Sequence, residues 1–163
     1  MLFTGTFEHA IDTKNRLSIP AQIRGQMDPR RDGPGWYIVP GRPASTLWLY
    51  TQRYFEALCD TIGPELIPDD AVLSFEQEFF PKATLLEPDP QGRVLIPDWL
   101  LKQSGVGREV VICGVRDHLE IRRRDEWARS AEAGWRMFPE LQLKARRALE
   151  QRRRQSGQGP DNT

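Results

Sequence analysis

The chain has 163 residues, of which 39% are hydrophobic and 28% charged, an ordinary composition for a globular protein with a core of its own. No apolar run approaches the roughly 18 residues that span a bilayer, and the start, MLFTGTFEHAID, lacks the basic and apolar regions of a signal peptide. The sequence therefore predicts a cytosolic protein without a membrane partner. Lys and Arg number 23, as do Asp and Glu, and this neutrality taken alone argues against a nucleic-acid-binding protein.

The charges are segregated along the chain, however. Residues 1–53 carry seven Lys/Arg and four Asp/Glu, residues 54–81 carry seven Asp/Glu and no Lys/Arg, and residues 82–163 carry sixteen Lys/Arg and twelve Asp/Glu. A net charge of zero can therefore hide a basic face opposite an acidic one.

In chain order, the predicted elements repeat. Each half reads as strand, turn, strand, short helical stretch, strand, loop, strand and helix. The corresponding segments are FEHAID (7–12) and TLLEPD (84–89), QIR (22–24) and WLL (99–101), WYIVPG (36–41) and EVVICG (109–114), and LWLYTQRYF (47–55) and LEIRRRDEW (119–127). Two copies of one unit predict an α+β protein whose halves pair about a pseudo-two-fold axis into one shared core.

Helices are predicted over 54–63, 68–83, 124–138 and 139–155, from the spacing of apolar residues and from Gly and Pro at helix ends. The predicted organisation is a first repeat at 1–53, an acidic helical connection at 54–81, a second repeat at 82–127, C-terminal helices at 128–155 and a disordered tail at 156–163.

The two halves share one phrase, DTKNRLSIP (12–20) and DPQGRVLIP (89–97). Asp12 and Asp89 each open a predicted type I turn, in which the side chain accepts a hydrogen bond from the backbone two residues on. Asn15 and Gly92 close these turns, because both residue types tolerate the left-handed conformation that follows such a turn.

The residues after each turn alternate as a short strand does. Leu17 and Val94 are expected to face the core, so that Arg16 points outward in the first copy and Arg93 points outward with Leu95 in the second. A proline then ends each strand, since it cannot donate to a sheet ladder. Each repeat therefore presents an arginine just past a rigid turn.

The sequence gives little support for a catalytic site or a metal site. Cys59, Cys113 and the two histidines are scattered, so no metal or cofactor is predicted, and both cysteines are expected to be reduced and near the core. Two symmetry-related Asp residues resemble the aspartic protease dyad, but an Arg four residues on keeps each carboxylate ionised. Because G-x-S-x-G, P-loop and HExxH motifs are also missing, no enzyme activity and no catalytic residue are predicted.

The doubled phrase resembles the MraZ family of bacterial transcriptional regulators over about residues 1–140. The resemblance is carried by MLFTGTFEHAIDTKNRLSIPAQIR, by LLEPDPQGRVLIPDWLLKQSGV and by the ending LEIRRRDEW. Asn15 departs from the family, which usually has Gly there, and the segment from residue 144 onward is the least family-like. The resemblance implies an AbrB-like fold, in which two swapped-hairpin repeats form one pseudo-two-fold, barrel-like core with flanking helices.

The resemblance also implies a function. The chain is expected to form a ring-like homo-oligomer without a cofactor and to bind direct repeats in double-stranded DNA. These repeats are expected in the promoter of its own division and cell-wall operon, where the protein acts mainly as a repressor, in the cytoplasm and nucleoid.

Arg16, Arg93 and Lys14 at the turn tip are the candidate DNA contacts. The simpler interpretation of each arginine is an ion pair with the Asp four residues earlier, which braces the turn and suits Arg93 better than Arg16. A second function class also stays open, namely an antitoxin-like or other protein-interaction module that uses the basic helix 139–155 to hold a partner.

Overall fold

The computed structural model describes residues 2–63 and 69–155. It contains two compact units, Met1–Arg124 and Asp125–Thr163. The predicted disordered tail at 156–163 lies outside the described residues. In the part of the chain that the structure describes, no helix is both long and apolar enough to cross a membrane.

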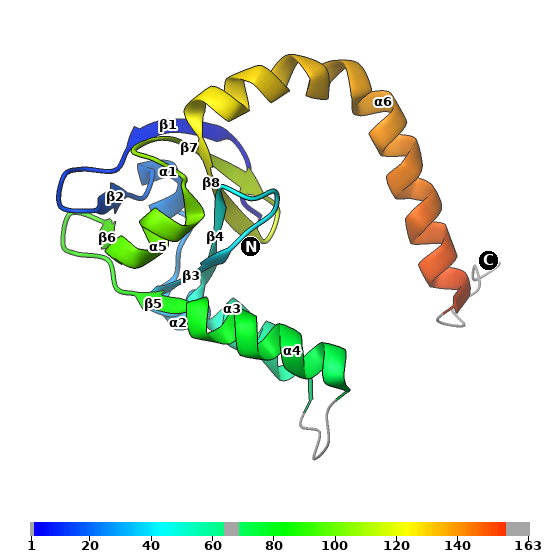
Figure 1. Cartoon of the computed structure of the whole chain (residues 1–163), viewed down its shortest axis with the longest axis horizontal. Coiled ribbons are helices and arrows are strands. Elements are labelled where there is room, and N and C mark those ends of the chain that lie inside the picture. Colours follow the sequence, from blue (N-terminus) through cyan, green and yellow to red (C-terminus); the bar gives the residue numbers. More distant parts are fainter. Residues whose placement is uncertain (1, 64–68, 156–163) are drawn as a thin grey trace. The chain divides into compact units, whose positions relative to one another are not determined.

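The first unit is built around a six-stranded antiparallel sheet (Figure 1). In spatial order its strands are β1 (Thr6–Ala10), β7 (Glu109–Val115), β8 (His118–Arg123), β4 (Thr46–Thr51), β3 (Trp36–Pro40) and β5 (Thr84–Leu86). Each half lends its first strand to the other half, because β1 pairs with β7 and β5 pairs with β3. The two halves therefore share one sheet, and the predicted α+β class is confirmed.

The sheet is not the closed barrel that the predicted barrel-like core suggested. Closure needs a pair between the two edge strands, but β1 and β5 lie at opposite ends of the sheet with four strands between them. Each edge strand has a single strand partner within the described residues. The core is thus an open, exchanged sheet.

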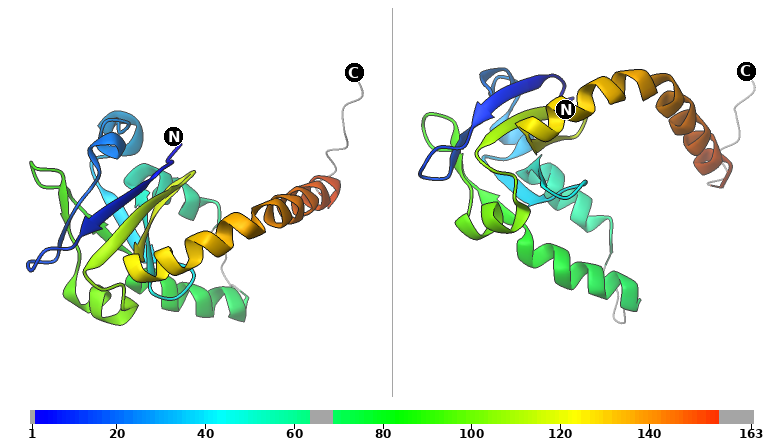
Figure 2. Two further views of the ribbon diagram at one scale, coloured as in Figure 1. Left: turned by 90° about the horizontal axis from the view of Figure 1, so that it is seen from above. Right: turned by 45° about the horizontal axis from the view of Figure 1, so that its top comes forward.

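A second sheet has two strands, β2 (Arg16–Ser18) and β6 (Arg93–Leu95), one from each repeat. Leu17 lies opposite Val94, and both side chains are fully buried, so the predicted alternation is confirmed. We call this pair of strands the ribbon. Figure 2 shows the two turns that lead into the ribbon on the same side of the unit, away from the helices of residues 52–79.

The helical segments of the first unit are α1 (Ala21–Arg24), α2 (Pro29–Asp32), α3 (Gln52–Asp60), α4 (Asp70–Phe79), the 3-10 turn η1 (Phe80–Lys82) and α5 (Asp98–Ser104). The helix predicted over 68–83 is shorter than expected, because Pro81 has no N–H to donate to the carbonyl four residues earlier, and the chain continues as the 3-10 turn. Position 68 lies outside the described residues. The short α2, capped by the Asp28 carboxylate on the N–H of Arg30, is not predicted by the sequence pattern.

The predicted break between helices 124–138 and 139–155 is wrong. A single helix, α6 (Arg124–Gln155), runs through Pro139, and it curves along its length in Figure 1. Proline removes one hydrogen bond to the carbonyl four residues earlier, which bends a helix without having to end it. That carbonyl belongs to Trp135, which is 82% exposed, so water can replace the missing donor.

The cysteines are both free thiols. Burial raises the pKa of Cys113 to about 11, so this thiol stays protonated at neutral pH. Cys59 is half-buried against the smaller apolar cluster around Phe55. Within residues 2–63 and 69–155, no group of three His, Cys, Asp or Glu side chains could hold a metal ion.

The main core joins the inner face of the ribbon to one face of the large sheet. Its members are Phe3, Ile11, Leu17, Ile19, Ile23, Trp36, Ile38, Leu47, Leu49, Leu86, Val94, Ile96, Leu100, Val106, Val110, Ile112, Leu119 and Ile121. Both repeats contribute, so neither half has a complete core alone.

Replacing Leu17 by Ala should lower the free energy of unfolding by about 2–5 kcal/mol, the usual cost of truncating a buried leucine, because Leu17 has no exposed surface. Leu95→Ala is the matched control: it removes the same atoms from the outer face of the ribbon, where Leu95 is 61% exposed, and should cost below about 0.5 kcal/mol. Denaturant unfolding of the full chain measures both. An equal decrease in the free energy of unfolding for Leu17→Ala and Leu95→Ala would contradict the described packing of the ribbon.

Candidate nucleic-acid interface

The first turn, between β1 and β2, is held by Asp12. One carboxylate oxygen of Asp12 accepts hydrogen bonds from the backbone N–H groups of Lys14 at 2.8 Å and of Arg16 at 2.9 Å. The Asp12 carbonyl accepts a third bond from the Asn15 N–H at 3.0 Å. Asn15 has a φ of 61°, the left-handed conformation expected of it. These bonds fix the direction in which the chain leaves the turn.

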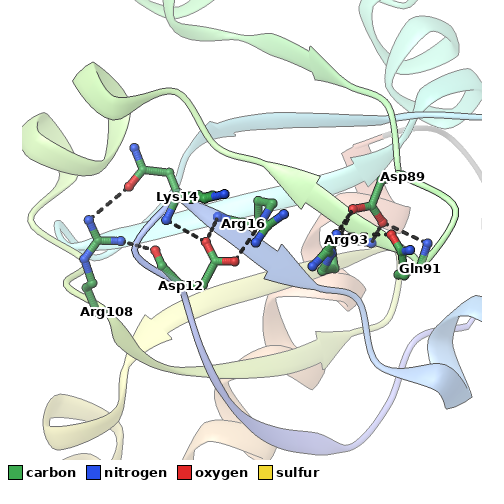
Figure 3. A network of polar contacts seen from close by, with 8 residues as sticks. Asp12, Lys14, Arg16, Asp89, Gln91, Arg93 and Arg108 are labelled. Atoms are coloured by element: carbon green, nitrogen blue, oxygen red, sulfur yellow. Dashed lines mark hydrogen bonds and ion pairs between the residues drawn. The ribbon is translucent and has the colours of Figure 1, made fainter.

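The second turn repeats this geometry around Asp89. Its carboxylate accepts from the N–H groups of Gln91 at 3.0 Å and Arg93 at 2.9 Å, and its carbonyl accepts from Gly92 at 2.8 Å. Gly92 has a φ of 76°. Figure 3 shows the two turns, each with its polar network. Asp12, Asn15, Asp89 and Gly92 thus all take part in the hydrogen bonding or the left-handed backbone of these turns.

Both arginines form the ion pair that braces the turn. Arg16 Nε donates to Asp12 Oδ2 at 2.8 Å. Arg93 donates to Asp89 Oδ2 through Nε at 2.8 Å and lies 2.7 Å from it through Nη2, and Nη2 also donates to Gln91 Oε1 at 3.1 Å. Both terminal nitrogens of Arg16, by contrast, lack a hydrogen-bond partner among the described residues. Arg16 therefore keeps more donors for a ligand than Arg93 does.

The same contacts keep the two carboxylates charged. The backbone hydrogen bond from Arg16, assisted by its guanidinium, holds the pKa of Asp12 below its ordinary value. For Asp89 the guanidinium of Arg93 is the largest cause of the lowered pKa, followed by its backbone N–H. Each carboxylate therefore stays ionised well into the acid range and holds its arginine in one direction.

Register places both arginines on one face of the ribbon. Arg16 lies opposite Leu95, and Ser18 lies opposite Arg93. Residues that pair across two strands point to the same side, and so do residues two apart on one strand. Arg16, Arg93, Ser18 and Leu95 therefore form the outer face, opposite the buried Leu17 and Val94. By strand geometry, the Cα atoms of the two arginines are diagonal neighbours about 7–8 Å apart.

Two further arginines lie against the turns from the opposite repeat, and the sequence motif does not reveal them. Arg108 donates to the Asp12 carbonyl and, at 3.0 Å, to Asn15 Oδ1 (Figure 3). Arg24 covers Gly92 so closely that a Cβ atom there would lie 2.5 Å from the Arg24 side chain. Strand exchange explains the first contact, since the register Ala10–Glu109 brings Arg108 beside the first turn.

Lys14, the third predicted contact, is exposed at the tip of the first turn. Its ammonium group has no ion pair within the described part of the chain. The equivalent residue of the second turn is Gln91, whose side chain accepts from Arg93. The first turn therefore carries the larger share of unpaired positive charge.

Changing both Asp12 and Asp89 to Asn should flatten the loss of stability in acid. Their pKa values are lowered in the folded protein, so their stabilising effect is present above the unfolded-state value of about 3.9 and is lost as pH falls through the lowered values. The double variant should take up fewer protons on unfolding near pH 3–4, by at most about two. Denaturant unfolding at a series of pH values measures this difference.

Glu87→Gln is the control, because Glu87 is exposed in the same loop and has no ion pair among the described residues. It should leave the acid slope unchanged. An unchanged slope in the Asp12→Asn, Asp89→Asn variant would show that the two turns do not depend on charged carboxylates.

The chain is similar to members of one known protein family. The family model described as "MraZ protein, putative antitoxin-like" matches residues 79–147. The transcriptional regulator MraZ of Symbiobacterium thermophilum is 33% identical over 137 residues, 84% of this chain and 95% of that protein. The one of Thermomicrobium roseum is 34% identical over 131 residues, 80% and 88% of the two chains. The one of Clostridium acetobutylicum is 27% identical over 132 residues, 81% and 89% of the two chains.

These relatives are named as transcriptional regulators, which are not enzymes, so the prediction that the chain is not an enzyme is confirmed. The likeness extends over 88–95% of the length of these relatives, and the residues matched by the family model include the second Asp-x-x-x-Arg turn. The chain belongs to the MraZ family of transcriptional regulators.

Proposed function

We propose that the chain is a sequence-specific DNA-binding regulator and that the outer face of the ribbon is its reading surface. The observation that carries the proposal is the placement of Arg16 and Arg93 on the outer face of the ribbon, where both side chains are half-buried and each is fixed by a turn. The major groove of DNA admits a two-stranded β-ribbon, and arginine is the commonest reader of guanine there.

The ion pairs support this role as well as the bracing role. A guanidinium that is held through Nε keeps its terminal nitrogens directed outward, and these are the nitrogens that bind guanine O6 and N7 or two phosphate oxygens. Arg16 has both of them without a partner among the described residues, so we assign base contact to Arg16 first. Arg93, whose Nη2 is engaged by Gln91 and Asp89, contributes less.

Phosphate contacts would fix the ribbon on the duplex. Lys14 is exposed at the turn tip, and the guanidinium groups of Arg24 and Arg108 lie beside the two turns. Such contacts position a protein without reading sequence. DNA binding is compatible with zero net charge, because α3 and α4, which come mostly from the acidic stretch 54–81, lie away from the turns in both views of Figure 2.

One ribbon carries few charges, so a single copy is expected to bind weakly. We therefore propose a ring-like homo-oligomer that engages direct repeats in the promoter of its own division and cell-wall operon, where later contacts become intramolecular. It acts there as a repressor, in the cytoplasm and nucleoid. The exchanged strands and paired hairpins support an AbrB-like fold with repeats at 1–53 and 82–127, joined by the acidic connection 54–81.

An antitoxin-like function is the second candidate. It is favoured by the description of the matching family model and by the end of α6, where residues 144–155 hold six Lys or Arg and one Glu. A partner-binding role predicts a stable complex with a small protein encoded beside this chain. A regulator instead requires DNA preference, so binding to the two kinds of partner discriminates between them.

Arg16→Ala should weaken binding to the protein's own upstream DNA by about five- to 150-fold, since a bidentate guanine contact is worth about 1–3 kcal/mol. Arg93→Ala should cost less. Fluorescence anisotropy at physiological salt, with a scrambled duplex of equal length beside it, measures the loss. Arg53→Ala is the control for charge alone, because Arg53 is exposed on α3 and its loss should leave the preference intact.

Arg16→Lys separates reading from bracing. Lysine keeps the charge beside Asp12 but cannot donate in a bidentate fork. The Arg16→Lys variant should therefore lose preference for the native duplex, while its circular dichroism spectrum shows an intact fold. Unfolding of the Arg16→Ala variant would identify Arg16 as a structural brace and remove it from the interface.

Deleting residues 144–163 should lower affinity for the scrambled duplex and reduce the salt dependence of binding, because six cations are removed from α6. Preference for the native repeats should persist. Light scattering provides the second readout: loss of the oligomer on deletion would assign this segment to assembly.

A further inference from the structure

An exposed leucine lies on the outer face of the ribbon, at the end that also holds Arg16. Leu95 is 61% exposed and stands directly opposite Arg16 in the strand register. Arg93 precedes it by two residues and shares its face. Single exposed leucines are common on protein surfaces, but this one adjoins the two side chains proposed to enter the major groove.

The pseudo-two-fold symmetry shows which residue of the first repeat corresponds to Leu95. Exchange of the two repeats maps Arg16 onto Arg93 and Leu17 onto Val94, both pairs of like residues. It also maps Leu95 onto Ser18, because Ser18 lies opposite Arg93 as Leu95 lies opposite Arg16. The outer face therefore holds two arginines related by symmetry and, between them, one apolar and one hydroxyl side chain. The two ends of the ribbon are equivalent in shape and different in chemistry.

The edges of the bases offer one apolar group in the major groove, the 5-methyl of thymine. Leucine has no hydrogen-bonding group, so this methyl is what it can recognise there, whereas serine can donate to or accept from any base. We propose that Leu95 contacts the 5-methyl of a thymine beside the base that Arg16 reads, and so fixes the orientation of the ribbon on the DNA. This inference rests on the proposed DNA-binding function.

The consequence concerns the arrangement of binding sites. A ribbon with identical ends would read both strands of its site alike and favour a palindrome. A leucine at one end and a serine at the other give each ribbon a polarity. Repeats of one orientation then suit an array of identical subunits that all face the same way.

The test uses the full chain and the duplex that it selects most tightly from a random pool. Each thymine is replaced singly by deoxyuridine, which pairs as thymine does but lacks the methyl group. Removing one buried methyl should weaken wild-type binding about fourfold at one thymine in each repeat, from about 0.8 kcal/mol per methylene-sized group. Anisotropy titration provides the dissociation constants.

Leu95→Ala should bind the thymine and deoxyuridine duplexes equally at that position. Ser18→Ala, the symmetry-related control, should keep the wild-type fourfold difference. Leu95→Met, which retains an apolar side chain, should keep most of it. Light scattering on every variant tests whether the assembly is unchanged.

The possible results separate the two proposals. If no duplex is enriched from the pool, the proposed function fails and this inference fails with it. If a duplex is enriched but wild type is indifferent to every deoxyuridine, the function stands and the role of Leu95 is overturned. Equal sensitivity of Leu95→Ala and wild type overturns it too. If Leu95→Ala changes the size of the assembly, Leu95 belongs to a contact between subunits and the inference is likewise rejected.

Discussion

Strand exchange between the two repeats is the constraint on which the rest of the structure depends. The pairing of β1 with β7 and of β5 with β3 forces both halves into one sheet and one core. It also brings β2 and β6 together, because the turns that lead into them start from the exchanged strands. A short strand pair of three residues on each side is marginal by itself. Here the buried Leu17 and Val94 hold it against a core that neither repeat could build alone.

The two turns then fix the direction of Arg16 and of Arg93. Each Asp carboxylate receives two backbone N–H bonds and one guanidinium. Bracing and the proposed binding are therefore compatible roles for Arg16, because its Nε serves the turn while both terminal nitrogens lack a hydrogen-bond partner among the described residues. The difference between Arg16 and Arg93 follows in part from one neighbour, since Gln91 accepts from the guanidinium of Arg93, whereas the equivalent residue of the first turn is Lys14, which cannot accept a hydrogen bond.

Features governed by local chemistry could be read from the sequence. The Asp-x-x-[Asn/Gly]-Arg pattern predicted the turns, the left-handed residues Asn15 and Gly92, and the inward direction of Leu17 and Val94. Features that depend on pairing between distant segments could not. The contacts of Arg108 with Asn15 and of Arg24 with Gly92 require the exchanged register, and the open sheet required knowing which strands form the edges.

The same division applies to the candidate site. The motif located both arginines, but only the register of β2 against β6 places them on one face with Leu95 and Ser18. At Pro139 the sequence-based prediction was wrong because it gave too much weight to a local rule, namely that proline ends a helix. An exposed helix can bend at proline where the freed carbonyl faces water, so the residue type alone did not decide between a bend and an end.

Methylation interference on the selected duplex tests most directly whether the ribbon enters the major groove. Methyl groups are placed at guanine N7, which lies in the major groove, and at adenine N3, which lies in the minor groove. The account predicts that methylation of discrete guanines in each repeat prevents wild-type binding, whereas methylation of adenines in the same repeats has no effect. Interference from adenine N3 alone, or from neither base, would contradict a ribbon that reads DNA through Arg16 in the major groove.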